Sequence, residues 1–328
     1  MDINWSYKNK SRVFDTKESA GVPYLSFKAL DDTGLAVNGF STRMGGASRG
    51  KFSTMNFSYS RGDAAEDVLE NFTRMAAALG VERDRMVVSH QTHTVNLRRV
   101  TLEDAGKGVV RERDYRDIDG LITDVPGLTL VTFYADCVPL YLLDPVNRAI
   151  GLSHSGWRGT VKRMGQVTVD AMKEAFGTKP EDLIACVGPS ICRDCFEVGG
   201  EVVEEFREAF GPEHREALYC QGKRPGKYQL DLWKANEIIF REAGIRRENI
   251  HITNICTMCN SDYLFSHRKV GEGAGETWQR FCALSRVRFA KEKGRGAIWM
   301  YYWRSGLLYA VYRLLWRTTD RRSISTFG

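Results

Sequence analysis

The chain has 328 residues, of which 43% are hydrophobic and 27% charged, and its formal net charge is +6. This composition is ordinary for a globular protein with a sizeable core. Basic residues greatly outnumber acidic ones after Ser285, so the preceding part is slightly acidic, which excludes nucleic-acid binding as an expectation for the main body. No secretory signal is recognised in the first residues, which predicts a cytoplasmic location and makes the eight cysteines reduced thiols or metal ligands.

The N-terminal part of the chain predicts strands followed by a glycine turn. Strands are expected between Val22 and Arg43, and Gly45 and Gly46 mark the turn that follows. An arginine beside such a turn is usually a solvated surface residue. The functional alternative is that the fork of Arg43 and the close backbone recognise an oxyanion.

Two histidines follow the next pair of predicted elements. A helix is expected over Ala64–Leu79 and a strand over Met86–Ser89. His90 and His93 come directly afterwards, and either is a candidate ligand, because spacing alone does not choose between them. The charged, glycine-interrupted segment Gly106–Arg116 is expected to be an exposed loop.

The stretch from Leu128 to Gly159 carries the strongest signal. It contains three short apolar runs that are typical of buried strands, namely Leu128–Tyr134, Leu140–Leu143 and Ala149–Leu152. Asp136, Cys137, His154 and Arg158 follow the ends of these runs, so they are candidates to converge at one mouth of a sheet. A single cysteine or histidine near a strand is usually structural, but their closeness here favours a functional site.

The remaining pattern alternates helices with strands. Helices are predicted over Thr160–Phe176, Glu201–Phe210 and Leu232–Ala243, and strands over Leu183–Val187 and Ile250–Ile255. Because several other strands follow one another directly, the pattern predicts a mixed sheet rather than a regular doubly wound one.

Two CxxC pairs, Cys192/Cys195 and Cys256/Cys259, are candidates for a second metal site. Four cysteines at this spacing are able to close a tetrahedral structural zinc site. The roughly sixty intervening residues contain full helices, unlike a compact zinc ribbon, which argues against a shared ion. The sequence leaves open whether the pairs bind metal.

Many short segments of the chain match one family in the family's own order. They are TRMGGAS (Thr42–Ser48), NFS within Met55–Ser58, QTHT (Gln91–Thr94), DGLIT (Asp119–Thr123), ADCVPL (Ala135–Leu140), HSGWRGT (His154–Thr160), VGPSI (Val187–Ile191), FEVG (Phe196–Gly199) and CTMCNSDYLFSHR (Cys256–Arg268). On these segments the chain resembles the YfiH/LACC1 family, also called the laccase-domain or multicopper polyphenol oxidase family, whose members are viewed as purine nucleoside phosphorylases.

The resemblance implies an α+β fold, a mixed β-sandwich flanked by helices and related to the cysteine-hydrolase-like fold. Residues 1–285 would form a single catalytic domain and residues 286–328 a basic, aromatic C-terminal extension. The resemblance also implies a metal bound by His93, Cys137 and His154. Two imidazoles and a thiolate leave a fourth position open on Zn²⁺, as in catalytic zinc sites, and Cu²⁺ also suits this set.

The chain departs from the family pattern in two places. Residues 271–281 replace the usual threonine-glycine-arginine turn, and His267 stands where tyrosine is usual. Beyond Ser285 the resemblance stops.

The activity that the resemblance implies is phosphorolysis of adenosine, inosine, guanosine and methylthioadenosine, accompanied by adenosine deamination. In this hypothesis Arg43 and Arg158 bind phosphate, and Asp136 protonates the departing purine as general acid. The metal at His93, Cys137 and His154 would activate water for deamination.

Three alternatives remain open. Copper-dependent oxidation of polyphenols through a multicopper centre needs more histidines than the six in the chain. Cysteine-type amide hydrolysis, linked to peptidoglycan-precursor editing, would use Cys137 as nucleophile and His154 as base, and so needs a thiolate that is not bound to metal. The non-enzyme alternative is weak membrane-surface contact through residues 297–322, in which Ala297–Trp316 would lie as an interfacial helix. The native metal, the preferred nucleoside and the oligomeric state do not follow from the sequence.

Overall fold

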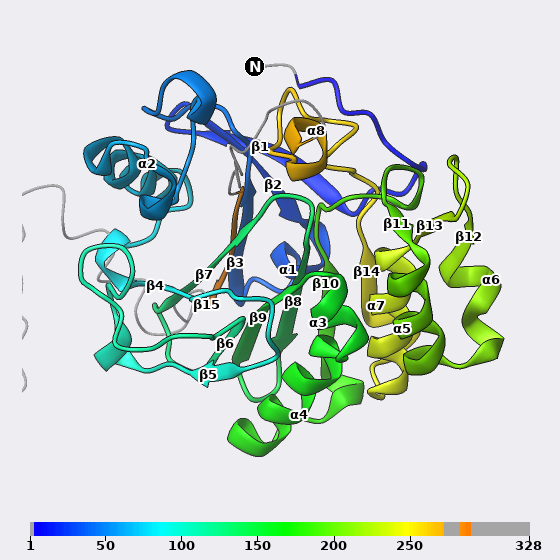
Figure 1. Ribbon diagram of the computed structural model, residues 1–328. Helices are drawn as coiled ribbons and strands as arrows, with labels where there is room; N and C mark the ends of the chain where they lie inside the picture. The colour runs from blue at the N-terminus through cyan, green and yellow to red at the C-terminus, as the bar shows by residue number, and fades with distance from the viewer. Residues whose placement is uncertain (1–2, 272–282, 290–328) are drawn as a thin grey trace, which may run out of the picture. The chain divides into compact units, whose positions relative to one another are not determined.

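The structure is a computed structural model that describes residues 3–271 and 283–289, all within one compact unit (Figure 1). The membrane-surface prediction for residues 297–322 and the departure at residues 272–281 lie outside the described residues. Within the described ranges, no helix is long and apolar enough to cross a membrane.

Two six-stranded sheets form the body of the fold. The first contains, in hydrogen-bonded order, β1 (Phe14–Ser19), β2 (Val22–Phe27), β3 (Ala36–Ser41), β15 (Ala283–Phe289), β7 (Thr129–Tyr134) and β4 (Met86–Val88). The second contains β14 (Ile250–Ile252), β10 (Ile184–Val187), β8 (Val138–Asp144), β9 (Ala149–Ser155), β6 (Gly120–Thr123) and β5 (Leu97–Arg99). Each sheet combines antiparallel pairs with parallel ones, such as β4 with β7 and β5 with β6, so the predicted mixed pairing is confirmed.

A small third sheet and the helices complete the fold. The third sheet contains β11 (Glu197–Gly199), β13 (Lys227–Leu230) and β12 (Tyr219–Gln221). The α-helices are α1 (Lys28–Asp31), α2 (Ala65–Ala78), α3 (Trp157–Val161), α4 (Met164–Phe176), α5 (Gly200–Phe210), α6 (Arg215–Leu218), α7 (Leu232–Glu242) and α8 (His267–Gly271). Short 3-10 helices are η1 (Gly50–Phe52), η2 (Tyr59–Arg61), η3 (Arg83–Arg85), η4 (Leu102–Asp104), η5 (Pro180–Asp182), η6 (Arg193–Cys195), η7 (Pro212–His214) and η8 (Arg247–Asn249).

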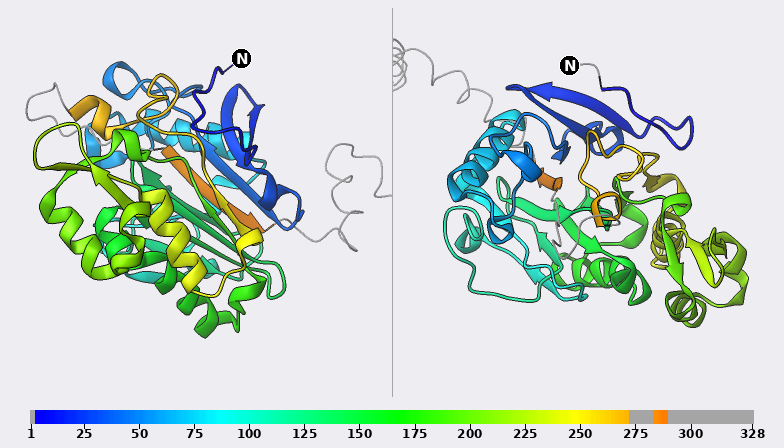
Figure 2. Two further views of the ribbon diagram at one scale, coloured as in Figure 1. Left: turned by 90° about the vertical axis from the view of Figure 1, so that its right-hand side faces the viewer. Right: turned by 45° about the horizontal axis from the view of Figure 1, so that its top comes forward.

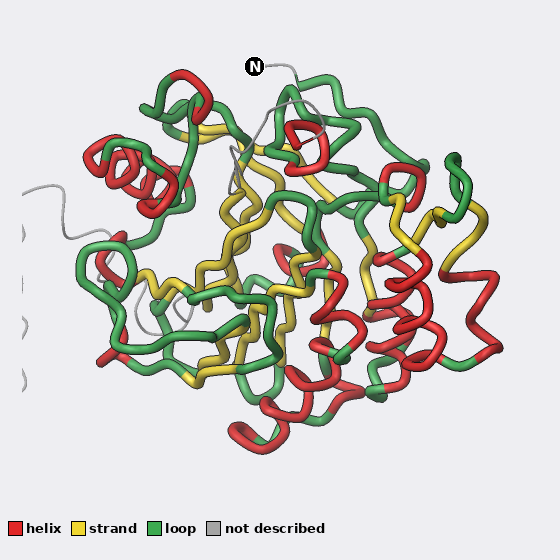
Figure 3. Tube along the Cα trace, in the orientation of Figure 1, coloured by secondary structure: helices red, strands yellow, loops and turns green. Residues whose placement is uncertain are grey.

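The helices cover the two large sheets unequally. Helices α4 and α7 contact the second sheet, whereas α2 contacts β1 and β2 of the first sheet. Figure 3 shows α2 apart from the group α3 to α7, and the left view of Figure 2 places the helices of that group in front of the sheets. Helices α3, α4 and α7 cover one face of the second sheet, α5 and α6 contact the third sheet, and the other face of the second sheet packs against the first sheet.

The core lies between the two large sheets. Phe27 of β2 meets Tyr141 of β8 edge to face, with ring centroids 5.2 Å apart. The Tyr134 hydroxyl on β7 donates a hydrogen bond of 2.9 Å to the carbonyl of Ser153 on β9. These contacts join the sheets into a sandwich, which confirms the predicted α+β fold.

The register of three adjacent strands places polar residues at one edge of the second sheet. Pro139 of β8 pairs with His154 of β9, and Gly120 of β6 pairs with Ser153 of β9. Cys137 and Asp119 directly precede β8 and β6. These two residues and His154 therefore reach the same end of the sheet.

Several predicted elements differ from the observed ones. The strand predicted over Ile250–Ile255 ends at Ile252, and the segment Gly106–Arg116, expected to be an exposed loop, buries Val109 and Tyr115. The helix predicted over Thr160–Phe176 is two helices, α3 and α4, because Arg163 between them has a φ of 60°, in the left-handed region that a continuous helix does not contain. The strand predicted to end at Leu152 continues to Ser155, so His154 lies inside β9.

The boundary predicted after residue 285 falls inside β15. The backbone of this strand pairs with β3 on one side and β7 on the other. The division into a catalytic domain and an extension stays a prediction.

Candidate metal centre and adjoining cavities

His93, Cys137 and His154 come together at the end of the second sheet. Each offers one ligand atom, and these atoms all lie within 4.8 Å of one another. The Cys137 Sγ lies 3.9 Å from the His93 Nε2, and the two histidine rings are nearly perpendicular, with centroids 4.9 Å apart. The structure thus selects His93 over His90 for this cluster.

A buried carboxylate, that of Asp119, organises the cluster. Its Oδ1 lies 2.8 Å from the Nδ1 of His154, and its main-chain oxygen accepts a 2.7 Å hydrogen bond from the amide of His154. Because Nδ1 is held by the carboxylate, Nε2 of His154 is left as the ligand atom.

The same carboxylate shapes the loop that carries His93. The amides of Thr92, His93 and Thr94 donate hydrogen bonds of 2.9–3.0 Å to the two oxygens of Asp119. His93 has a φ of 65°, and this left-handed conformation lets successive amides face one anion. Asp119 therefore positions two of the three candidate ligands.

Gly156 leaves the space that the cluster occupies. A Cβ at this position would lie 3.1 Å from both Cys137 Sγ and His93 Cδ2, which is tighter than ordinary contact. Any larger residue would displace a candidate ligand.

The charges in the cluster are strongly coupled. Burial raises the pKa of Cys137, but the charge of His154 and hydrogen bonds from both histidines outweigh burial and lower it to about 6. Burial lowers the pKa of His154, but the Cys137 thiolate and Asp119 raise it to about 9. Burial also opposes ionisation of Asp119, yet its hydrogen bond with His154 lowers the pKa of that carboxyl to about 2. These shifts favour a thiolate at Cys137.

This donor set fits a mononuclear catalytic metal. Two imidazole nitrogens and one thiolate, with a carboxylate behind one imidazole, give Zn²⁺ three ligands and an open position. In the described part of the chain, the other candidate group contains only cysteines, so a multicopper centre rich in histidines is not present there.

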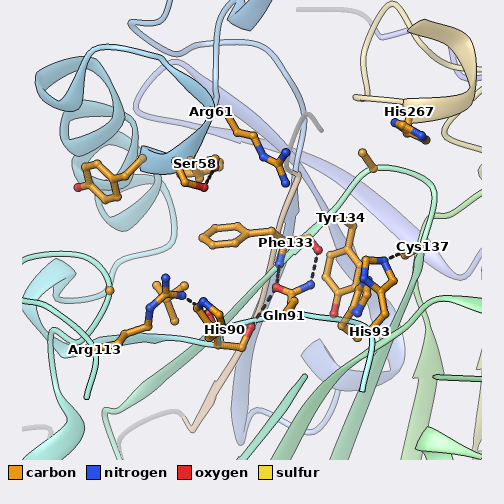
Figure 4. Close-up of a pocket in the computed structure, with 18 residues that line it drawn as sticks. Ser58, Arg61, His90, Gln91, His93, Arg113, Phe133, Tyr134, Cys137 and His267 are labelled. Atoms are coloured by element: carbon orange, nitrogen blue, oxygen red, sulfur yellow. Dashed lines mark hydrogen bonds between the residues drawn. The ribbon is translucent and has the colours of Figure 1, made fainter. Parts of the chain in front are cut away.

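A cavity of about 360 Å³ opens beside the cluster (Figure 4). Its walls include the three candidate ligands together with cationic, aromatic and polar side chains, namely Ser58, Tyr59, Arg61, His90, Gln91, Arg113, Phe133, Tyr134 and His267. Figure 4 shows Arg61 reaching from η2 toward the space above Phe133. The volume is within the range of small-molecule sites.

Hydrogen bonds fix two of the wall residues. The Gln91 side chain accepts from the Phe133 amide at 2.7 Å and donates to the Phe133 carbonyl at 2.7 Å, so it holds Phe133 in place. The Nδ1 of His90 accepts a hydrogen bond from the amide of Asp117 at 3.1 Å. Because Nδ1 is an acceptor, the neutral ring carries its proton on Nε2 and is a hydrogen-bond donor there.

A second cavity of about 360 Å³ shares His93, Ala135, Cys137 and His267 with the first. Arg158 lines this second cavity, and its guanidinium lies 4.3 Å from the centroid of the Trp157 ring. Arg158 is therefore near the cluster, as predicted, but on the wall of a different cavity from Arg61.

Asp136 lines the second cavity but makes structural hydrogen bonds. Its Oδ1 accepts from the Thr257 hydroxyl and its Oδ2 from the Arg268 amide, both at 2.6 Å. Burial raises the pKa of Asp136. The role of general acid stays a prediction, and the contacts show that Asp136 binds the 257–268 segment.

Arg43 lies apart from both cavities. It lines a separate pocket with Met44, Ser53 and Asp262. Its Nε donates to the carbonyl of Ser53 at 3.0 Å and its Nη1 to the carbonyl of Ser261 at 3.1 Å. Two donors of the guanidinium therefore bind backbone, and phosphate binding by Arg43 remains a prediction.

Sequence reasoning missed several residues of the site. Asp119 lies within the matching segment DGLIT, which by itself assigns it no role, and no sequence pattern distinguishes Arg61 or Phe133. One signal for Asp119 is its position in the chain. It directly precedes β6, and β6 pairs with β9, the strand that contains His154. No local pattern points to Arg61, because η2 reaches the cavity only through the tertiary fold.

Together the sandwich and the mixed His/Cys cluster define a class of α+β protein with a candidate mononuclear metal centre at a sheet end. Residues 37–282 match the family described as multi-copper polyphenol oxidoreductase laccase. The chain belongs to this laccase-domain family.

Individual relatives agree with this assignment. The chain is 34% identical over 238 residues to a purine nucleoside phosphorylase, YlmD, of Geobacillus stearothermophilus, covering 71% of this chain and 85% of the relative. It is 34% identical over 246 residues to adenosine deaminase RL5 of an unknown prokaryotic organism, covering 74% and 92%. The crystal structure of the Bacillus licheniformis hypothetical protein YfiH has a TM-score of 0.76 and 27% identity, covering 85% of this chain and all of the other.

Proposed function

We propose that the protein is a purine nucleoside phosphorylase that works at a zinc centre formed by His93, Cys137 and His154. The observation that carries the proposal is a cavity of about 360 Å³ in which these side chains adjoin arginines and an aromatic ring. A nucleoside needs a flat apolar surface, and phosphate needs cations. The similarity to a relative named as a phosphorylase supports the same reading.

The cationic wall is suited to phosphate. Arg61 and Arg113 line the same cavity, and a guanidinium offers forked donors that match phosphate oxygens. The Nη1 of Arg113 also donates to the carbonyl of Ser89, which anchors that side chain beside the cavity. We assign phosphate binding chiefly to Arg61, with Arg113 adding positive charge.

The aromatic wall is suited to the purine. Phe133 is half-buried, and Gln91 hydrogen-bonds to its backbone amide and carbonyl, so the backbone that presents the ring for stacking is held in place. The Nε2 proton of His90 is available to an acceptor nitrogen of the base, because Nδ1 is already used by Asp117. His90 therefore orients the base and is a candidate donor to the leaving purine, alongside the predicted acid Asp136.

The reaction exchanges one bond for another. A phosphate oxygen bonds to C1′ of the ribose as the bond between C1′ and the purine nitrogen breaks, and the electron pair leaves with the base. The base takes up a proton, and the products are ribose 1-phosphate and free purine. Arginine side chains hold the attacking anion in line, which lowers the entropic cost of the encounter.

A zinc ion bound by the three ligands would supply Lewis-acid chemistry at the wall of this cavity. The chain's own part is to keep the three donors at fixed positions, with Asp119 fixing the tautomer of His154. Adenosine deamination at the same centre is the accompanying activity that we propose, supported by the relative named as an adenosine deaminase.

The copper-oxidase and cysteine-hydrolase alternatives make different demands on the same residues. A cysteine hydrolase needs Cys137 free of metal, and copper chemistry needs a redox ion and oxygen. Metal analysis, together with a test of whether the reaction requires phosphate, oxygen or neither, distinguishes the phosphorylase, the copper oxidase and the cysteine hydrolase.

The test is an assay of purine release from inosine and adenosine with and without inorganic phosphate. The proposal expects phosphate-dependent release of purine by the wild type. The Cys137→Ser variant should lose this release and should also lose one zinc ion per chain. The Cys220→Ser variant is the matched control, because Cys220 is exposed and outside both cavities. Activity of metal-free protein, or release that ignores phosphate, would overturn the proposal.

A further inference from the structure

A second group of metal-ligand side chains lies away from the cluster around Cys137. The Sγ atoms of Cys192, Cys195, Cys256 and Cys259 all lie within 4.8 Å of one another. The Sγ atoms of Cys195 and Cys259 are 3.5 Å apart, although these residues are separated by 64 positions in the chain. The fold thus brings together two CxxC pairs that are far apart in the sequence.

The spacing of the sulfurs matches one tetrahedral ion. A Zn–S bond of about 2.3 Å in tetrahedral geometry places neighbouring sulfurs about 3.8 Å apart. A disulfide needs a sulfur separation of about 2.05 Å, well below the observed 3.5 Å between Cys195 and Cys259. A polynuclear iron–sulfur cluster would occupy far more room between its cysteines. The arrangement therefore fits a mononuclear tetrathiolate site, for which zinc is the usual ion.

Each CxxC pair is held by a tight turn. The carbonyl of Cys192 accepts hydrogen bonds from the amides of Cys195 and Phe196 at 3.1 and 3.0 Å. The carbonyl of Cys256 accepts from the amide and side chain of Asn260 at 3.1 and 2.8 Å. These hydrogen bonds fix the backbone of each CxxC turn.

The surroundings stabilise negative sulfur. The amide of Cys192 donates to the Sγ of Cys256 at 3.3 Å, as amides do to metal-bound thiolates. Lys8 lies close by, and its pKa is raised by its hydrogen bond to Asp194 and by the charges of Cys192 and Cys259. Four thiolates on Zn²⁺ leave a net charge of −2, which a nearby ammonium partly offsets.

We propose that Cys192, Cys195, Cys256 and Cys259 bind a structural zinc ion that is separate from the centre at Cys137. The four sulfurs complete its coordination, so this ion has no open position for a substrate. It is a site of fold stability, and the proposal does not depend on the phosphorylase reaction.

The position of the site explains what the ion would stabilise. The carbonyl of Asp136 accepts a 3.0 Å hydrogen bond from the amide of Ile191, which precedes Cys192. The Asp136 carboxylate accepts from Thr257, which follows Cys256. Both zinc-binding turns therefore support Asp136, whose neighbour is the ligand Cys137. The zinc ion clamps the two segments that position this end of the sheet.

The chain offers a matched pair of exposed cysteines for a test on the natural sequence. Cys259 and Cys220 are both exposed, but only Cys259 belongs to the proposed site. With the reductant TCEP present, iodoacetamide should modify Cys259 at least about tenfold more slowly than Cys220, because a metal-bound thiolate is a poor nucleophile. After zinc has been removed by EDTA and its loss verified by elemental analysis, the two rates should converge.

Two outcomes of the alkylation experiment would overturn the proposal. One is equal modification of Cys259 and Cys220 in the zinc-loaded protein. The other is protection of Cys259 that TCEP alone removes, since this would identify a disulfide.

Zinc content gives an independent measurement on the full chain. Wild-type protein and Cys220→Ser should each contain about two zinc ions, and Cys137→Ser about one. Cys195→Ser/Cys259→Ser should also retain about one, with a lower melting temperature. Wild-type zinc content in this double variant, or iron in place of the second zinc, contradicts the proposal. If the double variant does not fold, the alkylation rates of the natural sequence decide.

Discussion

Asp119 and His154 form the contact on which the candidate metal centre is built, with Oδ1 of the carboxylate 2.8 Å from Nδ1 of the imidazole. Both side chains are buried at one end of the second sheet, where Asp119 directly precedes β6 and His154 lies in the neighbouring strand β9. The carboxylate also binds the three successive amides around His93. One anion thus sets the tautomer of one ligand and the backbone of another.

The first prediction follows from this contact. Asp119→Asn keeps the shape of the side chain but removes its charge, so His154 loses its orienting anion. We expect zinc affinity or kcat/KM to fall by about 10–100-fold. Competition with a chromophoric chelator measures the affinity. Asp117→Asn is the control, because Asp117 is exposed nearby, and an equal loss in both variants would remove the special role of Asp119.

The second prediction compares two arginines. Arg61→Lys keeps a positive charge but loses the fork, so the KM for phosphate should rise about tenfold while zinc content stays constant. Arg43→Lys should leave that KM unchanged and lower the stability by about 1–2 kcal/mol, because its guanidinium bonds to two backbone carbonyls. Steady-state kinetics at a series of phosphate concentrations measures the KM for phosphate of both variants. The reverse pattern would support the phosphate role that the sequence predicted for Arg43.

The third prediction concerns the purine. Phe133→Leu retains apolar volume but removes the aromatic face, so the KM for inosine should rise about tenfold. The KM for phosphate should change little, since Phe133 lies on the aromatic wall. Equal nucleoside affinity in the variant and the wild type would place the base elsewhere.

The fourth prediction concerns acid stability. Burial raises the pKa of Asp104, but hydrogen bonds from Lys107, the Thr101 amide and Arg98 outweigh it and lower the pKa to about 2, from an ordinary value of 3.8. A carboxyl with a depressed pKa contributes stability above its unfolded value and loses it as pH falls through the folded one. Unfolding of the wild type should therefore become easier between about pH 4 and pH 2.

Asp104→Asn is the variant that tests this dependence. It should cost about 1–3 kcal/mol near neutral pH, since it disrupts a buried charged network. Its stability should then vary less with pH over the same acidic interval. Denaturant melts across the series measure both effects, and parallel pH profiles for the two proteins would refute the assignment.

The fifth prediction concerns where the chain tolerates truncation. Ending the chain after Ser285 deletes residues 286–289 of β15, whose backbone pairs with both β3 and β7. This deletion should abolish cooperative folding, whereas ending after Ala290 should preserve activity. If residues 297–322 contact membranes, the longer variant should also lose binding to anionic vesicles. Thermal melts and vesicle sedimentation of both variants provide the measurements.

Local sequence patterns predicted the elements of the fold but not all of the contacts between them. The apolar runs around Cys137 and His154 indicated buried strands with polar ends, and the structure places these two residues together. The broken helix at Arg163 was missed because a single left-handed residue has no periodic signature. The division between sheets also depends on long-range pairing, such as β15 with β3, which periodicity does not contain.

The candidate site, like the fold, is predicted from the sequence only in part. The family resemblance supplied the set His93, Cys137 and His154, which the structure brings within ligand distance. Arg43 looked suited to phosphate because of its glycine turn, but the fold directs its donors to backbone carbonyls. The full helices between the two CxxC pairs argue against a shared ion, because sequence separation does not reveal that their turns lie together in the fold.

Isotope labelling of phosphate tests directly whether the protein carries out phosphorolysis. The zinc-loaded protein is incubated with inosine and phosphate labelled with ¹⁸O, and the products are analysed by mass spectrometry. Phosphorolysis should yield hypoxanthine and an equal amount of ribose 1-phosphate that carries all four labelled oxygens, because the attacking phosphate oxygen becomes the bridge to C1′. Free ribose formed without labelled sugar phosphate would contradict it.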